Sequence, residues 1–90
     1  MKKLQDKIAI ITGAGGGIGA ATARLFAQEG AKLVLTDINF DAVSAISKEI
    51  GGNTIALQHD VTSETSWQSI MDATIKQFGQ LDVLVNNAGI

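Results

Sequence analysis

The chain has 90 residues, of which 46% are hydrophobic and 18% charged, and its formal net charge is -2 at pH 7. This composition is typical of one small globular domain over residues 1–90; it excludes a disordered chain, and no apolar run is long enough to span a bilayer. The absence of cysteine excludes disulfides and thiolate metal sites, the scattered Lys and Arg residues argue against nucleic-acid binding, and we expect a cytoplasmic protein with no metal site.

The first strand-like run extends from Lys7 to Ile11 and leads without a spacer into a glycine-rich turn. Its continuous apolar character is typical of a strand that is buried on both faces. A helix is predicted to follow, because apolar residues recur at helical spacing, and to end at Gly30, because glycine commonly follows a helix. The residues expected on the buried face of this helix are Ile18, Ala21, Thr22, Leu25 and Phe26.

The turn from Thr12 to Gly19 has the glycine content of a phosphate-binding loop. A pyrophosphate must approach main-chain N–H groups that a Cβ would shield, and the N-terminus of the following helix attracts anions. We expect Gly13 to form the turn out of the strand, Gly17 to allow contact with phosphate, and Gly19 to let the helix lie close to the sheet. The alternative is a strand, turn and helix without a ligand.

The second strand is predicted from Lys32 to Thr36 and is followed by Asp37. A carboxylate at this position can accept the hydrogen bonds of both hydroxyl groups of an adenine ribose. It would repel the 2′-phosphate of NADP, and neither Gly16 nor Ile38 supplies a cation, so the pattern favours NAD over NADP. The alternatives for Asp37 are a solvated loop acid and the N-cap of the next helix.

The second helix is predicted to begin after Asn39 or Asp41, because either side chain can accept from a first-turn N–H group. It is expected to end at Gly51 and Gly52, and a third strand is predicted over residues 54–57. The residues expected to be buried on this helix are Val43, Ile46 and Ile50.

The third helix is predicted to begin after Thr62 or Ser63 and to end at Gly79. A fourth strand is predicted over residues 81–85. Six positions at helical spacing are expected to be buried in this helix: Trp67, Ile70, Met71, Thr74, Ile75 and Phe78.

This alternation predicts an α/β fold, half of a doubly wound Rossmann-type parallel sheet with the pattern β-α-β-α-β-α-β and the strand order 3-2-1-4. Right-handed crossovers would place the first two helices on one face of the sheet and the third on the other. Ligands bind such sheets at the carboxyl ends of the strands, where the strand order reverses. Four polar residues are expected along that edge: Thr12, Asp37, Asp60 and Asn86.

Four polar residues near this edge have more than one interpretation. Asp60 can accept a hydrogen bond from an adenine amino group or cap the third helix. His59 has no acid or nucleophile near it in sequence, so it is expected to be a solvent-facing loop residue rather than a catalyst. Asn86 and Asn87 are also typical of a simple turn after a strand.

Four segments, in this order, resemble the short-chain dehydrogenases/reductases: the turn from Thr12 to Gly19, Asp37, the pair Asp60-Val61, and the run from Asn86 to Gly89. The resemblance covers nearly the whole chain and implies that NAD binds. It implies that Asp60 and Val61 contact the adenine, that Asn86 braces the central strands, and that the residues after it follow the ribose toward the nicotinamide. The predicted cofactor-binding residues are therefore Gly13, Gly16, Gly17, Ile18, Gly19, Asp37, Ile38, Asp60, Val61, Asn87, Ala88 and Gly89.

The resemblance also places the family's catalytic serine, tyrosine and lysine beyond the Asn-Asn-Ala-Gly segment, and the chain contains no tyrosine. We therefore predict no catalytic residue and interpret the chain as a unit that binds NAD without turnover. One alternative is the amino-terminal part of an NAD-dependent oxidoreductase acting on an alcohol or carbonyl, active only with the missing carboxyl-terminal half. A second alternative is an S-adenosylmethionine-binding unit, although this ligand has no pyrophosphate for the glycine run.

The fourth strand is expected to be an unpaired edge of the sheet, beside an incompletely covered face. We expect the chain to self-associate, through a symmetric dimer that pairs two fourth strands or buries the third helix.

Overall fold

Strands and helices alternate along residues 3–88, the part of the chain that the computed structural model describes. Each strand except the last is followed by a helix, which gives parallel strands a crossover connection. The elements in chain order are β1 (Ile8–Thr12), α1 (Gly17–Gln28), β2 (Lys32–Asp37), α2 (Phe40–Ile50), β3 (Thr54–Gln58), α3 (Glu64–Phe78) and β4 (Val83–Val85).

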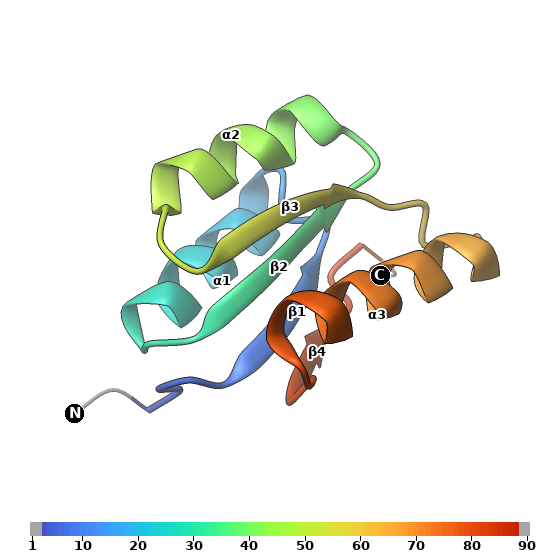
Figure 1. Cartoon of the computed structure of the whole chain (residues 1–90). Coiled ribbons are helices and arrows are strands. Elements are labelled where there is room, and N and C mark those ends of the chain that lie inside the picture. Colours follow the sequence, from blue (N-terminus) through green and yellow to red (C-terminus); the bar gives the residue numbers. More distant parts are fainter. Residues whose placement is uncertain (1–2, 89–90) are drawn as a thin grey trace.

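The four strands form one sheet in the order β3-β2-β1-β4, and every neighbouring pair is parallel. The predicted fold class and strand order are therefore confirmed. Helices α1 and α2 cover one face of the sheet, and α3 lies on the other (Figure 1). The order reverses between β1 and β4, where the chain leaves β3 through α3 to reach the far side of β1.

The alternating sides of the central strands supply two cores. Ala9, Ile11, Leu33 and Leu35 pack under α1 and α2, whereas Ile10 and Val34 pack against Ile70 of α3. Burial of each such aliphatic side chain stabilises the fold by about 1.5–3 kcal/mol. The central strands are thus apolar on both faces, which explains their continuous apolar sequence.

The ends of the helices follow local rules. The Asn39 side chain caps α2 by accepting from the backbone N–H of Ala42, and Ser63 caps α3 by accepting from that of Ser66. Gly79 ends α3 with φ of 85°, a left-handed conformation that glycine adopts without a Cβ penalty. Of the paired alternatives for these two N-caps, the structure therefore selects Asn39 and Ser63.

The predicted buried face of α1 is wrong at Ile18, Ala21 and Leu25, which are exposed, whereas Phe26 packs against the core as predicted. Ile18 is 77% exposed and Leu25 55% exposed, whereas Ala20 and Ala23 are buried. Small residues face inward because α1 packs closely on the sheet, and the large aliphatic side chains on its other side remain in solvent. In α3 the prediction fails at one position of six, because Ile75 is 48% exposed.

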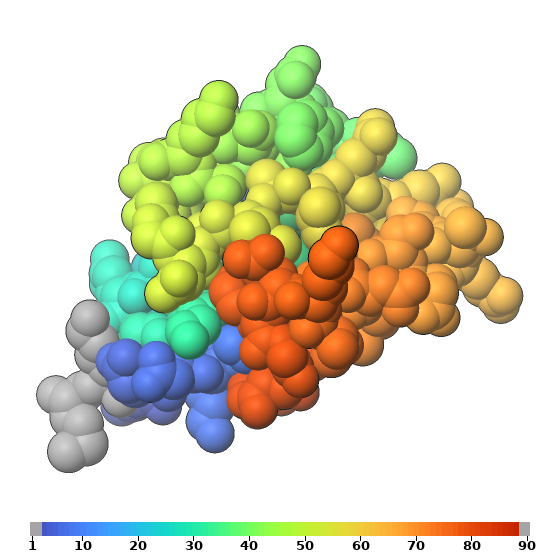
Figure 2. All heavy atoms as spheres, in the orientation of Figure 1, coloured from blue at the N-terminus to red at the C-terminus, as the bar shows by residue number. Residues whose placement is uncertain are grey.

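The last strand is shorter than predicted, since β4 begins at Val83 rather than at residue 81. Asp82 precedes it and joins it to β1: its backbone N–H donates to the Ile8 carbonyl, and its carboxylate accepts from the Ile8 N–H at 2.9 Å. Leu84 is 48% exposed on this strand, whose one partner strand within residues 3–88 is β1. The space-filling view shows α3 packed across the sheet below β3 (Figure 2).

Within residues 3–88, no helix has the length and apolar character needed to cross a membrane.

Candidate functional site

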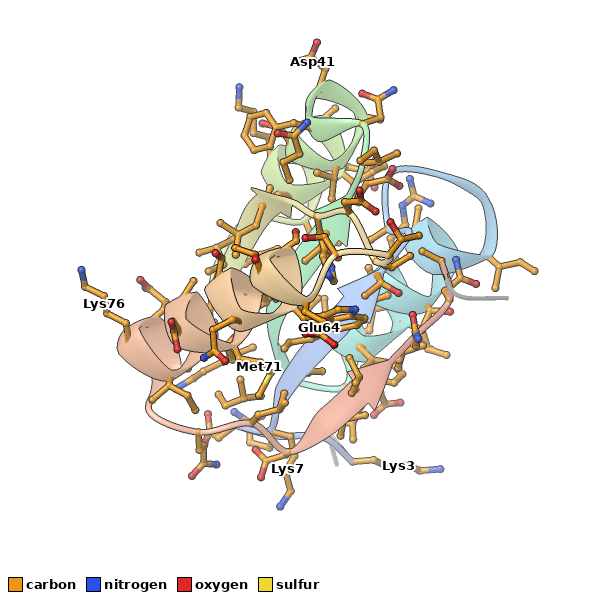
Figure 3. The ribbon with its side chains drawn as sticks, turned by 90° about the vertical axis from the view of Figure 1, so that its right-hand side faces the viewer. Lys3, Lys7, Asp41, Glu64, Met71 and Lys76 are labelled. Carbon is orange, nitrogen blue, oxygen red and sulfur yellow. The ribbon has the colours of Figure 1, made fainter. Side chains whose placement is uncertain are left out.

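The parallel sheet brings four segments that are distant in sequence to one edge, at the carboxyl ends of its strands. Thr12 ends β1, Asp37 ends β2, Asp60 follows β3 and Asn86 follows β4. We call this edge the carboxyl rim. Lys3 and Lys7 lie at the opposite end, where the strands begin (Figure 3).

The turn after β1 places glycine where a side chain would be strained or would clash. Gly13 has φ of 64°, which side-chain-bearing residues rarely adopt. Gly19 is buried in the first turn of α1, where a Cβ would lie 2.1 Å from the Gly13 carbonyl oxygen. Gly13 therefore forms the predicted turn, while Gly19 lets α1 approach the turn itself.

The N-terminus of α1 is open. Gly16, its N-cap, provides no side-chain hydrogen bond, and a Cβ added at Gly16 or Gly17 would meet no heavy atom of residues 3–88 within 4 Å. Ile18 is exposed beside them. The first N–H groups of a helix have no partner within the helix and carry its positive dipole end. The predicted phosphate-binding residues therefore form a surface that an anion can approach closely.

Asp37 is held beside this turn by two backbone donors. Its Oδ2 accepts from the N–H of Gly15 at 2.9 Å, and its Oδ1 accepts from the N–H of Asn39 at 3.0 Å. A carboxylate has about four acceptor positions, so each oxygen keeps capacity for another donor. The N-cap alternative for Asp37 is wrong because Asn39 caps α2. The neighbouring Ile38 is 63% exposed.

The segment after β4 is joined to the glycine turn by side-chain hydrogen bonds. The Thr12 hydroxyl donates to Asn86 Oδ1 at 3.0 Å and accepts from the Ala88 N–H at 3.1 Å. Asn87 Nδ2 donates to the Gly13 carbonyl at 3.3 Å. Asn86 therefore joins the segment after β4 to the end of β1, and Asn87 and Ala88 border the turn. Gly89, the last predicted site residue, lies outside the described residues.

Asp60 forms a tight turn with the residues after it. Its Oδ1 accepts from both the backbone N–H and the hydroxyl of Thr62, at 2.9 and 2.6 Å. The hydroxyl and then the backbone bond lower the pKa of Asp60, so the carboxylate stays charged. The alternative that Asp60 caps α3 is wrong, because Ser63 does so. Val61 is half-buried, and its carbonyl accepts from Trp67 Nε1 at 2.9 Å.

His59 is the residue at this edge that sequence reasoning misplaced. Predicted to face solvent, it is 1% exposed and pairs with the Thr36 hydroxyl through Nδ1 at 3.1 Å. A signal was present in the sequence: His59 continues the alternation of Ile55 and Leu57, which face the core beneath α3.

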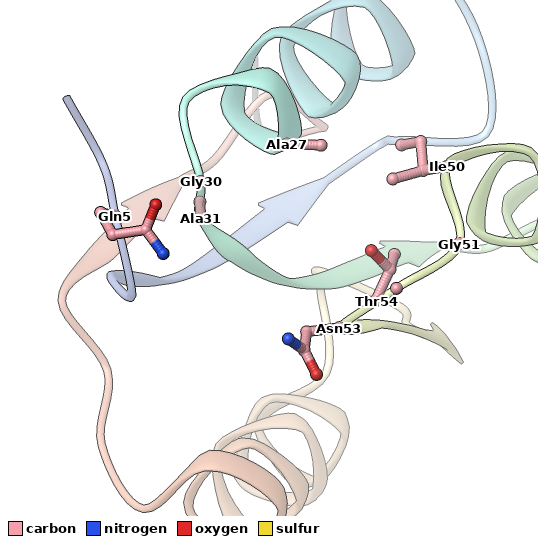
Figure 4. Close-up of a pocket in the computed structure, with 9 residues that line it drawn as sticks. Gln5, Ala27, Gly30, Ala31, Ile50, Gly51, Asn53 and Thr54 are labelled. Atoms are coloured by element: carbon pink, nitrogen blue, oxygen red, sulfur yellow. The ribbon is translucent and has the colours of Figure 1, made fainter. Parts of the chain in front are cut away.

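The carboxyl rim offers hydrogen-bond donors, hydrogen-bond acceptors and negative charge. Within residues 3–88, no group of three His, Asp or Glu side chains could hold a metal. A hollow of about 240 Å³ lies at the opposite end of the sheet and is lined mostly by small and uncharged residues, Gln5, Gly30 and Asn53 among them (Figure 4). We assign the site to the rim, because the open helix terminus and the fixed carboxylate meet there.

Comparison with known proteins supports this geometry. The family model described as short chain dehydrogenase matches residues 7–90. Tropinone reductase-like 1 of Erythroxylum coca is 44% identical over 89 residues, which are 99% of this chain and 33% of that protein. A hydroxysteroid dehydrogenase structure from Escherichia coli has a TM-score of 0.91 and 47% identity, covering 96% of this chain and 36% of its own.

A third similar protein is a 3-ketoacyl-(acyl-carrier-protein) reductase from Brucella melitensis, whose structure was solved in complex with NADH. Its TM-score is 0.89 and its identity 35%, covering 91% of this chain and 34% of that one. The chain thus spans about one third of the length of the relatives that it matches. Its sequence match, its strand order and the geometry of its glycine turn agree, and the chain belongs to the short-chain dehydrogenase family.

Proposed function

We propose that the chain binds NAD along the carboxyl rim. The pyrophosphate lies against the N–H groups at Gly16–Gly17, where α1 begins. The adenine ribose donates its hydroxyl hydrogen bonds to Asp37, and the adenine lies beside Asp60 and Val61. One observation carries this proposal. The N-terminus of α1 has no side-chain cap, and in the same turn the N–H group of Gly15 holds the Asp37 carboxylate beside it.

The remaining predicted residues complete the path of the dinucleotide. Gly13 and Gly19 shape the turn, and Ile18 and Ile38 offer exposed apolar side chains on either side of it. Asn87 and Ala88, joined to β1 through Thr12 and Gly13, lead toward the nicotinamide. Gly89 continues this path in the proposal. The Brucella melitensis relative, solved with NADH, supports this choice of ligand.

We propose that NAD is preferred over NADP. The Asp37 carboxylate occupies the position where a 2′-phosphate would lie, and like charges in contact oppose binding. Lys3 and Lys7 lie at the far end of the strands and cannot compensate (Figure 3).

We propose that turnover requires residues beyond these 90. The family acid is a tyrosine, and the sequence contains none. In this proposal the 90 residues hold the dinucleotide, and the whole protein is an NAD-dependent oxidoreductase acting on an alcohol or carbonyl. The bound nicotinamide would supply hydride chemistry, whereas residues 3–88 supply binding and orientation.

Calorimetric titration with NAD, NADP and S-adenosylmethionine tests the proposed ligand. We expect heat of binding with NAD, weaker binding with NADP and none with S-adenosylmethionine, because only the dinucleotides carry a pyrophosphate for the open terminus of α1. If S-adenosylmethionine bound and neither dinucleotide did, the chain would be the S-adenosylmethionine-binding unit of the alternative interpretation. Equal affinity for NAD and NADP would remove the preference and leave the binding.

We also propose that the chain self-associates as a symmetric dimer through the outer edge of β4 or the exposed face of α3. Leu84 on β4 and Ile75 on α3 are each 48% exposed, so a dimer would remove apolar surface from water. Sedimentation equilibrium of the 90-residue chain tests this, and a folded monomer at all concentrations would contradict it. The cytoplasmic location expected from the sequence stays a prediction.

A further inference from the structure

His59 is buried at the junction between β2, β3 and α3, although it was expected in solvent. Its ring packs edge-on against Trp67, with ring centroids 4.2 Å apart and planes at 86°. Its Nδ1 pairs with the Thr36 hydroxyl, and its backbone N–H donates to the Asp37 carbonyl at 3.0 Å. One residue therefore contacts the end of β2 and the start of α3 at once.

Trp67 extends this connection to the turn after β3. Its Nε1 donates to the Val61 carbonyl at 2.9 Å, so the ring that packs against His59 also holds the turn that contains Asp60 and Val61. The backbone N–H of Asp60 donates to Ser66, the neighbour of Trp67 in α3. Asp37 and the Asp60–Val61 turn are thus joined through the His59–Trp67 pair.

The surroundings of the second ring nitrogen of His59, Nε2, determine whether the ring can carry a positive charge. Nε2 is buried and has no hydrogen-bond partner among residues 3–88. A neutral ring leaves one buried nitrogen unpaired, whereas a protonated ring would bury an unpaired N–H together with a positive charge. The buried site therefore favours the neutral ring.

We propose that His59 is a positioning residue, whose neutral ring holds the Asp60–Val61 turn against Trp67 and thereby fixes it relative to Asp37. This inference rests on the proposed NAD site, since these are the residues assigned to the adenine and its ribose. Protonation of His59 opens the connection, and the adenosine end of the site loses its geometry. NAD affinity then depends on the protonation state of a residue that does not itself touch the ligand.

Burial and the neighbouring charge have opposite effects on the pKa of His59. Burial lowers the pKa of His59, and the negative charge of Asp60 raises it by a smaller amount. The other acidic groups on the packed elements are Asp37 on β2 and Glu64 and Asp72 on α3. The cations of these elements are Lys32, at the start of β2, and Lys76, in the last turn of α3, whereas residues 54–67 contain no Lys or Arg. The pKa therefore lies below its usual value, and the site is intact at neutral pH.

NMR of the 90-residue chain, from pH 7.5 down to the pH at which the imidazole signals show that His59 is protonated, tests the connection without any ligand. The chain has one histidine and one tryptophan, so the imidazole and indole signals are unambiguous. We expect the indole N–H of Trp67 to lose protection from hydrogen exchange, relative to the unfolded chain, over the same pH range in which His59 protonates. Protection that stays constant while His59 protonates would overturn the inference.

Calorimetry over the same pH range tests the consequence for the site. We expect NAD affinity to fall by up to tenfold per pH unit below the pKa of His59. His59→Gln, which can bond Thr36 but does not titrate, should show a flat profile. Trp67→Phe serves as a second variant if the first does not fold: it keeps a ring beside His59 but lacks the bond to Val61, and should bind NAD weakly at every pH. A wild-type profile as flat as that of His59→Gln would overturn the inference, whereas failure to bind NAD at any pH, with the NMR result intact, would overturn only the proposed function.

Discussion

Gly16 and Gly19 lie three positions apart in one turn and tolerate a side chain very differently. A Cβ at Gly19 would lie 2.1 Å from a backbone oxygen, whereas one at Gly16 would meet nothing within 4 Å. We expect Gly19→Ala to lower the free energy of unfolding by about 1–3 kcal/mol, the usual cost of overpacking. Gly16→Ala is the matched control and should change it by about 0.5 kcal/mol or less. Urea denaturation measures both, and equal midpoints for the two variants would contradict the close approach of α1 to the turn.

Asp37 carries the predicted cofactor preference. We expect Asp37→Ala to weaken NAD binding by about 10- to 100-fold, because a charged acceptor of the ribose hydrogen bonds is lost, and to narrow the difference between NAD and NADP. Titration calorimetry with both cofactors measures this change.

Asp41→Ala is the control for Asp37→Ala, since it removes an exposed acid of the same charge from the first turn of α2. It should leave both affinities unchanged. Because Asp37 also accepts from two backbone N–H groups, the melting temperature of each variant should be measured alongside. Unchanged NAD affinity in a folded Asp37→Ala protein would remove the assignment of the ribose to this residue.

At the scale of elements, β4 depends on a charged contact as well as on its ladder to β1. The Ile8 N–H and then the Gln80 side chain donate to Asp82, and these bonds lower its pKa. A lowered carboxylate pKa adds stability above the pKa of the unfolded chain, and this contribution disappears as the pH falls through the folded value. We therefore expect Asp82→Asn to melt below the wild type at pH 7. The difference in melting temperature should begin to shrink as the pH falls below about 4 and should vanish in stronger acid, once Asp82 is protonated in the folded protein.

Asp72→Asn is the matched control for the β4 contact, because Asp72 bonds only Gln68 of the same helix in the contacts described for residues 3–88. Thermal melting followed by circular dichroism from pH 2 to 7 measures both variants. If the melting temperatures of Asp82→Asn and wild type still differed at pH 2, the result would contradict an electrostatic origin of the stabilisation by Asp82.

Periodicity predicted the elements better than it predicted which side of a helix is buried. In α3 the six-position pattern was correct except at Ile75, because large apolar residues there pack against Ile10 and Val34. In α1 the same reasoning selected Ile18 and Leu25, which are exposed, since the helix packs through Ala20 and Ala23 instead. Hydrophobic periodicity assumes that the largest side chains face the core, and it fails where close packing needs small ones.

At the scale of the whole molecule, the proposal that these residues bind but do not turn over NAD can be tested with a chimera. Residues 1–90 would be joined to the remainder of the Escherichia coli hydroxysteroid dehydrogenase, which is 47% identical over the shared part. We expect NADH to form from a hydroxysteroid with the chimera and not with the 90-residue chain, because the missing acid/base residue, which accepts the hydroxyl proton in this direction, and the substrate pocket are then supplied. Absorbance at the NADH band measures the rate.

Two outcomes of the chimera experiment would count against the proposal. Turnover by the 90-residue chain alone would show that a group within it accepts the hydroxyl proton. A folded chimera that binds no NAD, beside an active parent enzyme, would show that the rim of this chain does not serve as the cofactor site.

The sequence by itself determined the order of the elements, the parallel sheet and the residues of the glycine turn, because these depend on local patterns: apolar runs, helix caps and the positions where a Cβ is excluded. Only the tertiary structure decided that Gly19 packs on the Gly13 carbonyl, that Asp37 is held by Gly15 and Asn39, and that His59 is buried. Those facts depend on contacts between segments that the chain brings together only when it folds, so they cannot be read from neighbours in sequence.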